Sequence, residues 1–211
     1  MTTKRTFLVA ALLTFFCIAS PQLSAQQSTP DRPALSNIVF NGDMAALLAQ
    51  LAEINKVNIG LETDPRQPRT NVKMEFRFTT VDELMEGVIK AAPGYRWRNQ
   101  NGFIDVYPSD AGCPLLETAV SDFHADNTNW LAAVEALINS SEVGTEMNVL
   151  GLTRLNLDHQ TAPTNLFSVS LKNVSLRQAL HEITKSSKNS FWMFKRSGNR
   201  GQNFSISTAP F

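Results

Sequence analysis

The sequence lacks a surplus of charge of either sign, and this shortage limits the partners that the protein can bind. Its 19 lysines and arginines balance its 19 aspartates and glutamates. A protein that holds nucleic acid or an anionic membrane surface by electrostatic attraction carries a basic surplus, which is missing here. We therefore predict that nucleic acid is not a partner of this chain.

Cysteine is also scarce, which excludes a disulfide-bonded fold. Cys17 lies in an N-terminal apolar segment that we expect to be removed, so that Cys113 is the single thiol of the mature chain. One thiol cannot form an intramolecular disulfide, and the core must be held by packing alone. The sequence leaves open whether Cys113 pairs with another chain.

A membrane-spanning run of apolar residues is missing at the N-terminus. The run Phe7–Ser20 is about 14 residues long, whereas a spanning helix needs about 20. Lys4 and Arg5 precede this run and Leu23-Ser24-Ala25 follows it, which is typical of a cleaved export signal. We predict a signal peptide at 1–25, a disordered tether at 26–35, a periplasmic or secreted protein, and no transmembrane segment after cleavage.

Catalytic and metal-binding motifs are missing as well. The three histidines, His124, His159 and His181, are scattered, and no second histidine stands one helical turn after His181. There is no Gly-x-Ser-x-Gly elbow and no Gly-rich phosphate loop. We interpret the histidines as surface residues and predict no enzymatic activity, no catalytic residue, no metal and no cofactor.

The sequence does contain an internal repeat. An offset of 95 residues carries Thr80–Val88 onto Ser175–Ile183 and Trp97 onto Trp192, whereas an offset of 83 aligns the helices that come earlier in each copy. The difference of 12 residues predicts an insertion in the second copy at about 140–165. A repeat of this kind indicates two copies of one small domain.

The first copy, 36–108, is predicted to have the order β-α-β-β-α-β-β. Alternating or helical spacing of apolar residues predicts each element. Thr80 and Glu83 form a capping box, and Asn101-Gly102 indicates a type I′ hairpin turn. The expected strands are 38–40, 57–61, 72–78, 95–98 and 103–107, and the helices are expected to follow Asp43 and Thr80.

The second copy, 119–211, follows a linker at 109–118 and is predicted to have the same order. Asp126 and Asn127 are the candidate caps of its first helix, and Ser175 caps its second. Within the insertion we expect a strand near 147–150 and an irregular loop at 159–164. Each copy is thus an α+β module in which two helices pack on one face of a small mixed sheet.

The run Leu171–Ile183 joins a strand, a Ser cap and a Leu-x-x-Ala-Leu-x-x-Ile helix. It resembles the short N-terminal domain (STN domain) shared by secretins and TonB-dependent receptors, and Leu47–Leu61 resembles the first helix and strand of that domain. The resemblance implies a protein-interaction module in a Gram-negative periplasm, where the domain forms a ring below the secretin channel or contacts a sigma-regulatory protein. No channel-forming part follows Phe211, so we expect an accessory that forms no pore itself.

Aromatic and basic residues are mixed in 95–98 and 191–196, as they are in platforms that stack on bases or sugars. Trp97 and Trp192 occupy equivalent positions in the two copies. This favours the interpretation that both side chains anchor the cores rather than stack on a ligand. Because Phe191 shares a strand face with Met193, we expect the last hairpin to expose an apolar patch. The candidate interaction surface is Phe191, Met193, Lys195 and Arg196.

These features together predict a periplasmic protein-interaction module that serves an envelope secretion, pilus or receptor-signalling assembly. Its partner would be an envelope protein that adds a strand to an open sheet edge or docks on the last hairpin. The identity of that protein and the oligomeric state are left open. The alternative is a regulatory protein that holds a small ligand or glycan with residues 140–165. A hydrolase assembled between the two modules is the least favoured alternative.

Overall fold

The computed structural model describes residues 38–63, 66, 70–76, 80–110, 112–155, 165–198 and 201–208. All of these residues belong to one compact unit. The predicted signal peptide, the tether and the loop at 159–164 lie outside these residues. None of the helices in the described ranges combines the length and the apolar character needed to cross a membrane.

In the first half, capping residues and a turn sequence mark where the helices begin and where the chain reverses. Asp43 accepts a hydrogen bond from the N–H of Ala45 at a helix start, and Thr80 and Glu83 form the predicted capping box. The turn Asn101-Gly102 has φ angles of 55° and 85°, as a type I′ turn requires. The elements are β1 (Ile38–Asp43), α1 (Met44–Asn55), β2 (Asn58–Glu62), β3 (Asn71–Phe76), α2 (Val81–Ala91), β4 (Tyr95–Gln100) and β5 (Phe103–Pro108).

Among the described residues, the second half contains a 3-10 helix and one more α-helix than the first. Its first long helix is capped by Asn129, whose side chain accepts from the N–H of Ala132. The predicted caps Asp126 and Asn127 are wrong, because both lie within the preceding strand. The elements are η1 (Pro114–Glu117), β6 (Ala119–Thr128), α3 (Trp130–Ile138), α4 (Ser141–Leu150), β7 (Thr153–Arg154), β8 (Phe167–Ser175), α5 (Leu176–Ser186), β9 (Phe191–Ser197) and β10 (Asn203–Ser207).

Helix α4 takes the place of the strand predicted near 147–150, and that prediction is wrong. Val143 is fully buried, and Met147 and Leu150 pack against the same core. These three residues recur at helical spacing, so one face of a helix covers the core. Gly151 ends the helix with a φ of 63°, the left-handed conformation that glycine adopts at low cost.

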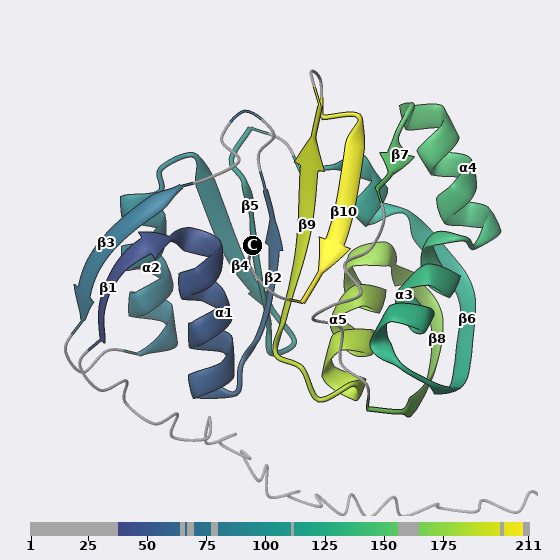
Figure 1. Cartoon of the computed structure of the whole chain (residues 1–211), viewed down its shortest axis with the longest axis horizontal. Helices are drawn as coiled ribbons and strands as arrows, with labels where there is room; N and C mark the ends of the chain where they lie inside the picture. The colour runs from purple at the N-terminus through teal and green to yellow at the C-terminus, as the bar shows by residue number, and fades with distance from the viewer. Residues whose placement is uncertain are drawn as a thin grey trace, which may run out of the picture. The chain divides into compact units, whose positions relative to one another are not determined.

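Strands from both halves form one six-stranded sheet with the order β4-β5-β2-β9-β10-β7. Parallel pairing of β2 with β9 joins the two halves (Figure 1). The prediction of a separate mixed sheet for each copy is therefore wrong. Two smaller antiparallel pairs, β1 with β3 and β6 with β8, complete the strands of the described residues.

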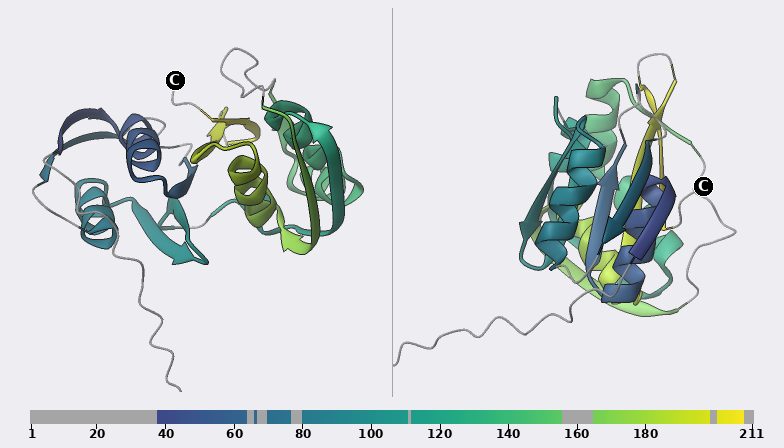
Figure 2. Two further views of the ribbon diagram at one scale, coloured as in Figure 1. Left: turned by 90° about the horizontal axis from the view of Figure 1, so that it is seen from below. Right: turned by 90° about the vertical axis from the view of Figure 1, so that its left-hand side faces the viewer.

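A hydrophobic core lies on each face of the six-stranded sheet. Helices α1 and α2 lie between one face and the β1–β3 pair, and α3 and α5 lie between the other face and the β6–β8 pair (Figures 1 and 2). In each half the helices are thus covered on two sides, rather than packed on one sheet as predicted. The arrangement of helices and a mixed sheet is consistent with the predicted α+β class.

Strand β9 belongs to both cores, because its successive side chains point to opposite faces of the sheet. Phe191 and Met193 pack into the first core, whereas Trp192 and Phe194 pack into the second. Four consecutive large apolar residues are typical of a strand that is covered on both faces. The apolar composition of β9 therefore explains why it lies inside a shared sheet.

Candidate functional site

A group of buried ionisable side chains connects β2 and β5 of the first half with α5 of the second. Glu62, Asp105, Arg177 and His181 are each no more than 2% exposed. The Nη2 of Arg177 lies 3.0 Å from Oε2 of Glu62, and its Nη1 lies 3.8 Å from Oδ1 of Asp105. A charge without a partner is costly at this depth, so these contacts hold the two halves in one relative position.

Strand alternation and helical spacing bring these four residues together. On β2 and β5 the apolar residues Ile59, Leu61, Ile104 and Val106 face the first core. The intervening positions, which include Glu62 and Asp105, therefore face the second half. On α5, Arg177 and His181 are four residues apart and lie on the same helix face.

The hydrogen bonds of His181 define its tautomer. The indole N–H of Trp192 donates to Nδ1 at 3.1 Å, so Nδ1 must carry a lone pair. The proton of the neutral ring is then on Nε2, which donates to Oδ1 of Asp105 at 2.7 Å. Both ring nitrogens are occupied, which leaves His181 no free lone pair for proton abstraction from a substrate.

The two buried carboxyl groups have opposite pKa shifts. Burial raises the pKa of Glu62, and the charge of Arg177 with the hydrogen bonds from Arg177 and the backbone N–H of Cys113 offsets only part of this effect. Burial also opposes the ionisation of Asp105. There, hydrogen bonds from His181 and Arg98 and the charge of Arg177 outweigh it and lower the pKa. Asp105 is thus the firmly ionised member of the group.

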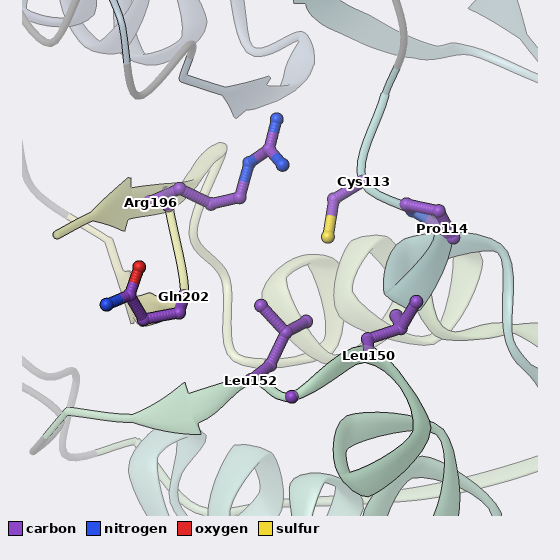
Figure 3. Close-up of a pocket in the computed structure, with 8 residues that line it drawn as sticks. Cys113, Pro114, Leu150, Leu152, Arg196 and Gln202 are labelled. Carbon is purple, nitrogen blue, oxygen red and sulfur yellow. The ribbon is translucent and has the colours of Figure 1, made fainter. Parts of the chain in front are cut away.

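A cavity of about 590 Å³ adjoins this group of charges. In Figure 3, Arg196 and Cys113 lie on opposite sides of it, with Leu152 below them. Its walls come from the segment before η1, the α4–β7 turn and the β9–β10 hairpin. The lining residues are Cys113, Pro114, Leu150, Gly151, Leu152, Arg196, Gly201 and Gln202.

The polar chemistry of the cavity is concentrated in Arg196. Its side chain is 18% exposed, its Nη2 lies 3.8 Å from Oε1 of Glu62, and its buried Nε has no hydrogen-bond partner among the described residues. Opposite it, burial raises the pKa of the Cys113 thiol, which makes the nucleophilic thiolate scarcer. Covalent chemistry at the Cys113 sulfur is therefore disfavoured.

The predicted interaction surface is in large part not at the surface. Phe191 and Met193 are each 4% exposed because they pack into the first core, where α1 lies against that face of β9. The prediction that they form an exposed apolar patch is wrong. Lys195 and Arg196 are half-buried, and only Arg196 lines the cavity.

The structure separates the three histidines. His124 is exposed, as predicted, whereas His181 is buried and the prediction of a surface residue is wrong for it. His159 lies outside the described residues. No group of three or more potential metal ligands occurs in the described ranges. Trp192 is fully buried, whereas Trp97 is half-buried at the edge of the first core.

Sequence reasoning missed the buried charges because each looks like an ordinary polar position on its own element. A signal was present in β5, where the acidic Asp105 stands between the apolar residues Ile104 and Val106. The signal in α5 was Arg177 and His181 at a spacing of four on a short helix. Pairing the two signals requires knowing that α5 lies against β2 and β5.

Comparison with models of protein families gave no match, and comparison with curated proteins gave none either.

Proposed function

We propose that this chain is an exported, non-enzymatic protein-interaction protein of the cell envelope. It would be built from two modules that resemble the STN domain, at 36–108 and 119–211, and would serve a secretion, pilus or receptor-signalling assembly. Equivalent strand pairings support the two-module proposal. The pairs β1–β3, β4–β5 and β2–β5 of the first half correspond in type and direction to β6–β8, β9–β10 and β7–β10 of the second.

The open outer edge of β4 is the observation that carries the interaction proposal. The offset of 95 residues makes β4 the counterpart of β9, and β9 binds the neighbouring strand β2 along this edge. Within the described residues, β4 pairs only with β5, in an unbroken register from Tyr95 to Gln100. A regular strand edge of this kind accepts a further strand from a partner.

The other end of the sheet supports strand addition less well. Strand β7, which forms that end, has two residues, Thr153 and Arg154, and the separate β6–β8 pair contains a register shift between Ala125 and Thr128. Short strands and bulges are features that protect sheet edges from pairing. We therefore assign partner binding to β4.

Site-specific crosslinking in cells that naturally make the protein tests this assignment. A photo-reactive amino acid replaces Asn99, which is exposed on β4, and in a matched control it replaces Ser170, which is exposed on β8. We expect an envelope protein to be crosslinked from Asn99 and not from Ser170. Equal crosslinking from both positions, or none from Asn99, would contradict the proposal.

A second function, binding of a small ligand, is supported by the cavity beside Arg196. Its volume lies within the range of small-molecule sites, and Leu150, Gly151 and Leu152 belong to the segment predicted as an insertion. The guanidinium of Arg196 on the cavity wall favours an anionic group, such as a carboxylate, next to an apolar body. Octanoate is therefore a suitable probe.

The test of this second function compares two neighbouring cations on opposite faces of β9. Arg196→Gln should weaken octanoate binding about tenfold or more because a charged hydrogen bond is lost, as measured by calorimetric titration. Lys195→Gln removes the same charge away from the cavity and should leave binding unchanged. If the two variants bind octanoate equally well, Arg196 has no role in ligand binding.

A further inference from the structure

The repeat assigns each residue of the α5–β9 interface a counterpart in the first half. At an offset of 95, Arg177 corresponds to Asp82, His181 to Glu86 and Trp192 to Trp97. The correspondence extends to a hydrogen bond. The indole N–H of Trp97 donates to Oε1 of Glu86 at 3.0 Å, as that of Trp192 donates to Nδ1 of His181 at 3.1 Å. The two surfaces therefore have the same local geometry.

The two surfaces differ in what covers them. In the second half, β2 and β5 cover the face formed by α5 and β9, so the side chains of Trp192, Arg177 and His181 are buried. In the first half, Asp82 and Glu86 are exposed and Trp97 is half-buried. No strand of the described residues pairs with the outer edge of β4 beside them, and we call these three residues with that edge the β4–α2 surface.

The covering strand in the second half shows which side chains fit such a surface. Gly60 lies against the indole of Trp192, and a Cβ atom there would come within 2.4 Å of the ring. Two residues on, Glu62 pairs with Arg177 at 3.0 Å. A strand that covers this geometry thus places a residue without a side chain over the tryptophan and a charge opposite the first turn of the helix.

At the Arg177 position the charge is reversed in the first half, and the neutral His181 is replaced there by an acid. Arg177 and His181 face the acids Glu62 and Asp105, whereas Asp82 and Glu86 are acids themselves. A strand that is complementary to the β4–α2 surface must therefore carry a basic residue where β2 carries Glu62. It would run parallel to β4, because β2 runs parallel to β9.

We propose that the β4–α2 surface binds a strand of a partner protein that carries glycine over Trp97 and lysine or arginine opposite Asp82 and Glu86. This inference rests on the proposed interaction function and specifies the chemistry of the partner.

A peptide copied from the chain provides the probe. The probe has the sequence of 57–63 with the change Glu62→Lys, and the control peptide has the unchanged sequence. Both are titrated into the full chain while the indole N–H resonances of Trp97 and Trp192 are followed by NMR, which detects weak binding. We expect saturable shifts of Trp97, little change at Trp192, and binding of the lysine peptide about threefold or more tighter than of the control.

A charge exchange in the protein makes the test reciprocal. The double variant Asp82→Arg with Glu86→His gives the first half the residues of the second. It should reverse the preference, so that the unchanged peptide with its glutamate binds more tightly than the lysine peptide. Both changes lie at exposed positions, and the thermal melt of the variant checks that its fold is intact.

The outcomes separate this inference from the function on which it rests. Shifts of Trp97 that are equal for the two peptides, or a preference that the double variant does not reverse, would overturn the basic-strand partner while crosslinking from Asn99 still supports an interaction at β4. Concentration-dependent self-association that blocks the peptide would overturn it in favour of a second copy of the chain. A lack of crosslinking from Asn99 would remove the interaction function itself.

Discussion

At the scale of single residues, Glu62 and Asp105 differ because of their partners and not because of their depth. Both are buried carboxyl groups near Arg177. Asp105 has two further side-chain donors, His181 and Arg98, at 2.7 and 3.0 Å. These donors lower the pKa of Asp105, whereas burial raises that of Glu62. Asp105 is therefore the residue whose ionisation stabilises the fold.

The variant Asp105→Asn tests this assignment through the pH dependence of stability. A carboxyl group with a lowered pKa stabilises the fold above its unfolded pKa, about 3.9, and this contribution is lost as pH falls through the folded value. Near pH 7 we expect the variant to be less stable by about 3 kcal/mol, because Arg177 and Arg98 lose a charged partner. The difference should shrink as pH falls below about 4.

Urea denaturation at a series of pH values measures both quantities. Comparison of the two proteins at each pH largely removes the contribution of Glu62, which is present in both. Asp122→Asn serves as the control because Asp122 is exposed on β6, and its effect should stay within about 0.5 kcal/mol. A stability difference for Asp105→Asn that does not change between pH 7 and pH 3 would contradict the assignment.

At the scale of elements, signals within one segment predicted most helices and strands. The capping box at Thr80, the cap at Ser175 and the helical spacing of apolar residues place α2 and α5 at their observed starts. Helix α4 was missed because serine, glycine and asparagine in its sequence favour turns. The helical spacing of Val143, Met147 and Leu150 is the local signal for this helix, and the burial of Val143 in the second core stabilises it.

The helical state of α4 predicts opposite effects for two glycines. A methyl group at Gly144 meets no atom within 4 Å, so Gly144→Ala should stabilise the protein by about 0.5–1 kcal/mol through helix propensity. Gly151→Ala should destabilise it by about 1 kcal/mol or more, because Gly151 has a φ of 63°. Urea denaturation of both variants gives the comparison, and an unchanged or lowered stability for Gly144→Ala would contradict a helical gain at this position.

At the scale of the whole molecule, the parallel pairing of β2 with β9 is the feature that the repeat did not predict. Two copies of one domain suggest two separate sheets, and only the apolar run from Phe191 to Phe194 indicated a strand covered on both faces. The buried charges follow from the same pairing, since it brings α5 against β2 and β5. Long-range pairing thus determines both the fold and the candidate site.

Shared use of β9 predicts that the two halves unfold together. Leu180 is fully buried in the second core, so Leu180→Ala should cost about 2–5 kcal/mol. Phe191 and Met193 of β9 help to form the first core. Leu180→Ala should therefore lower the opening free energy of the slowest-exchanging amides in β5 by the same amount as in β8, as measured by hydrogen exchange. The control is Ile54→Ala, which alters a side chain on α1 that is 57% exposed. It should change the opening free energies in β5 and β8 by no more than about 0.5 kcal/mol. Exchange in β5 that stays at its original rate while β8 opens would mean that the halves are independent modules.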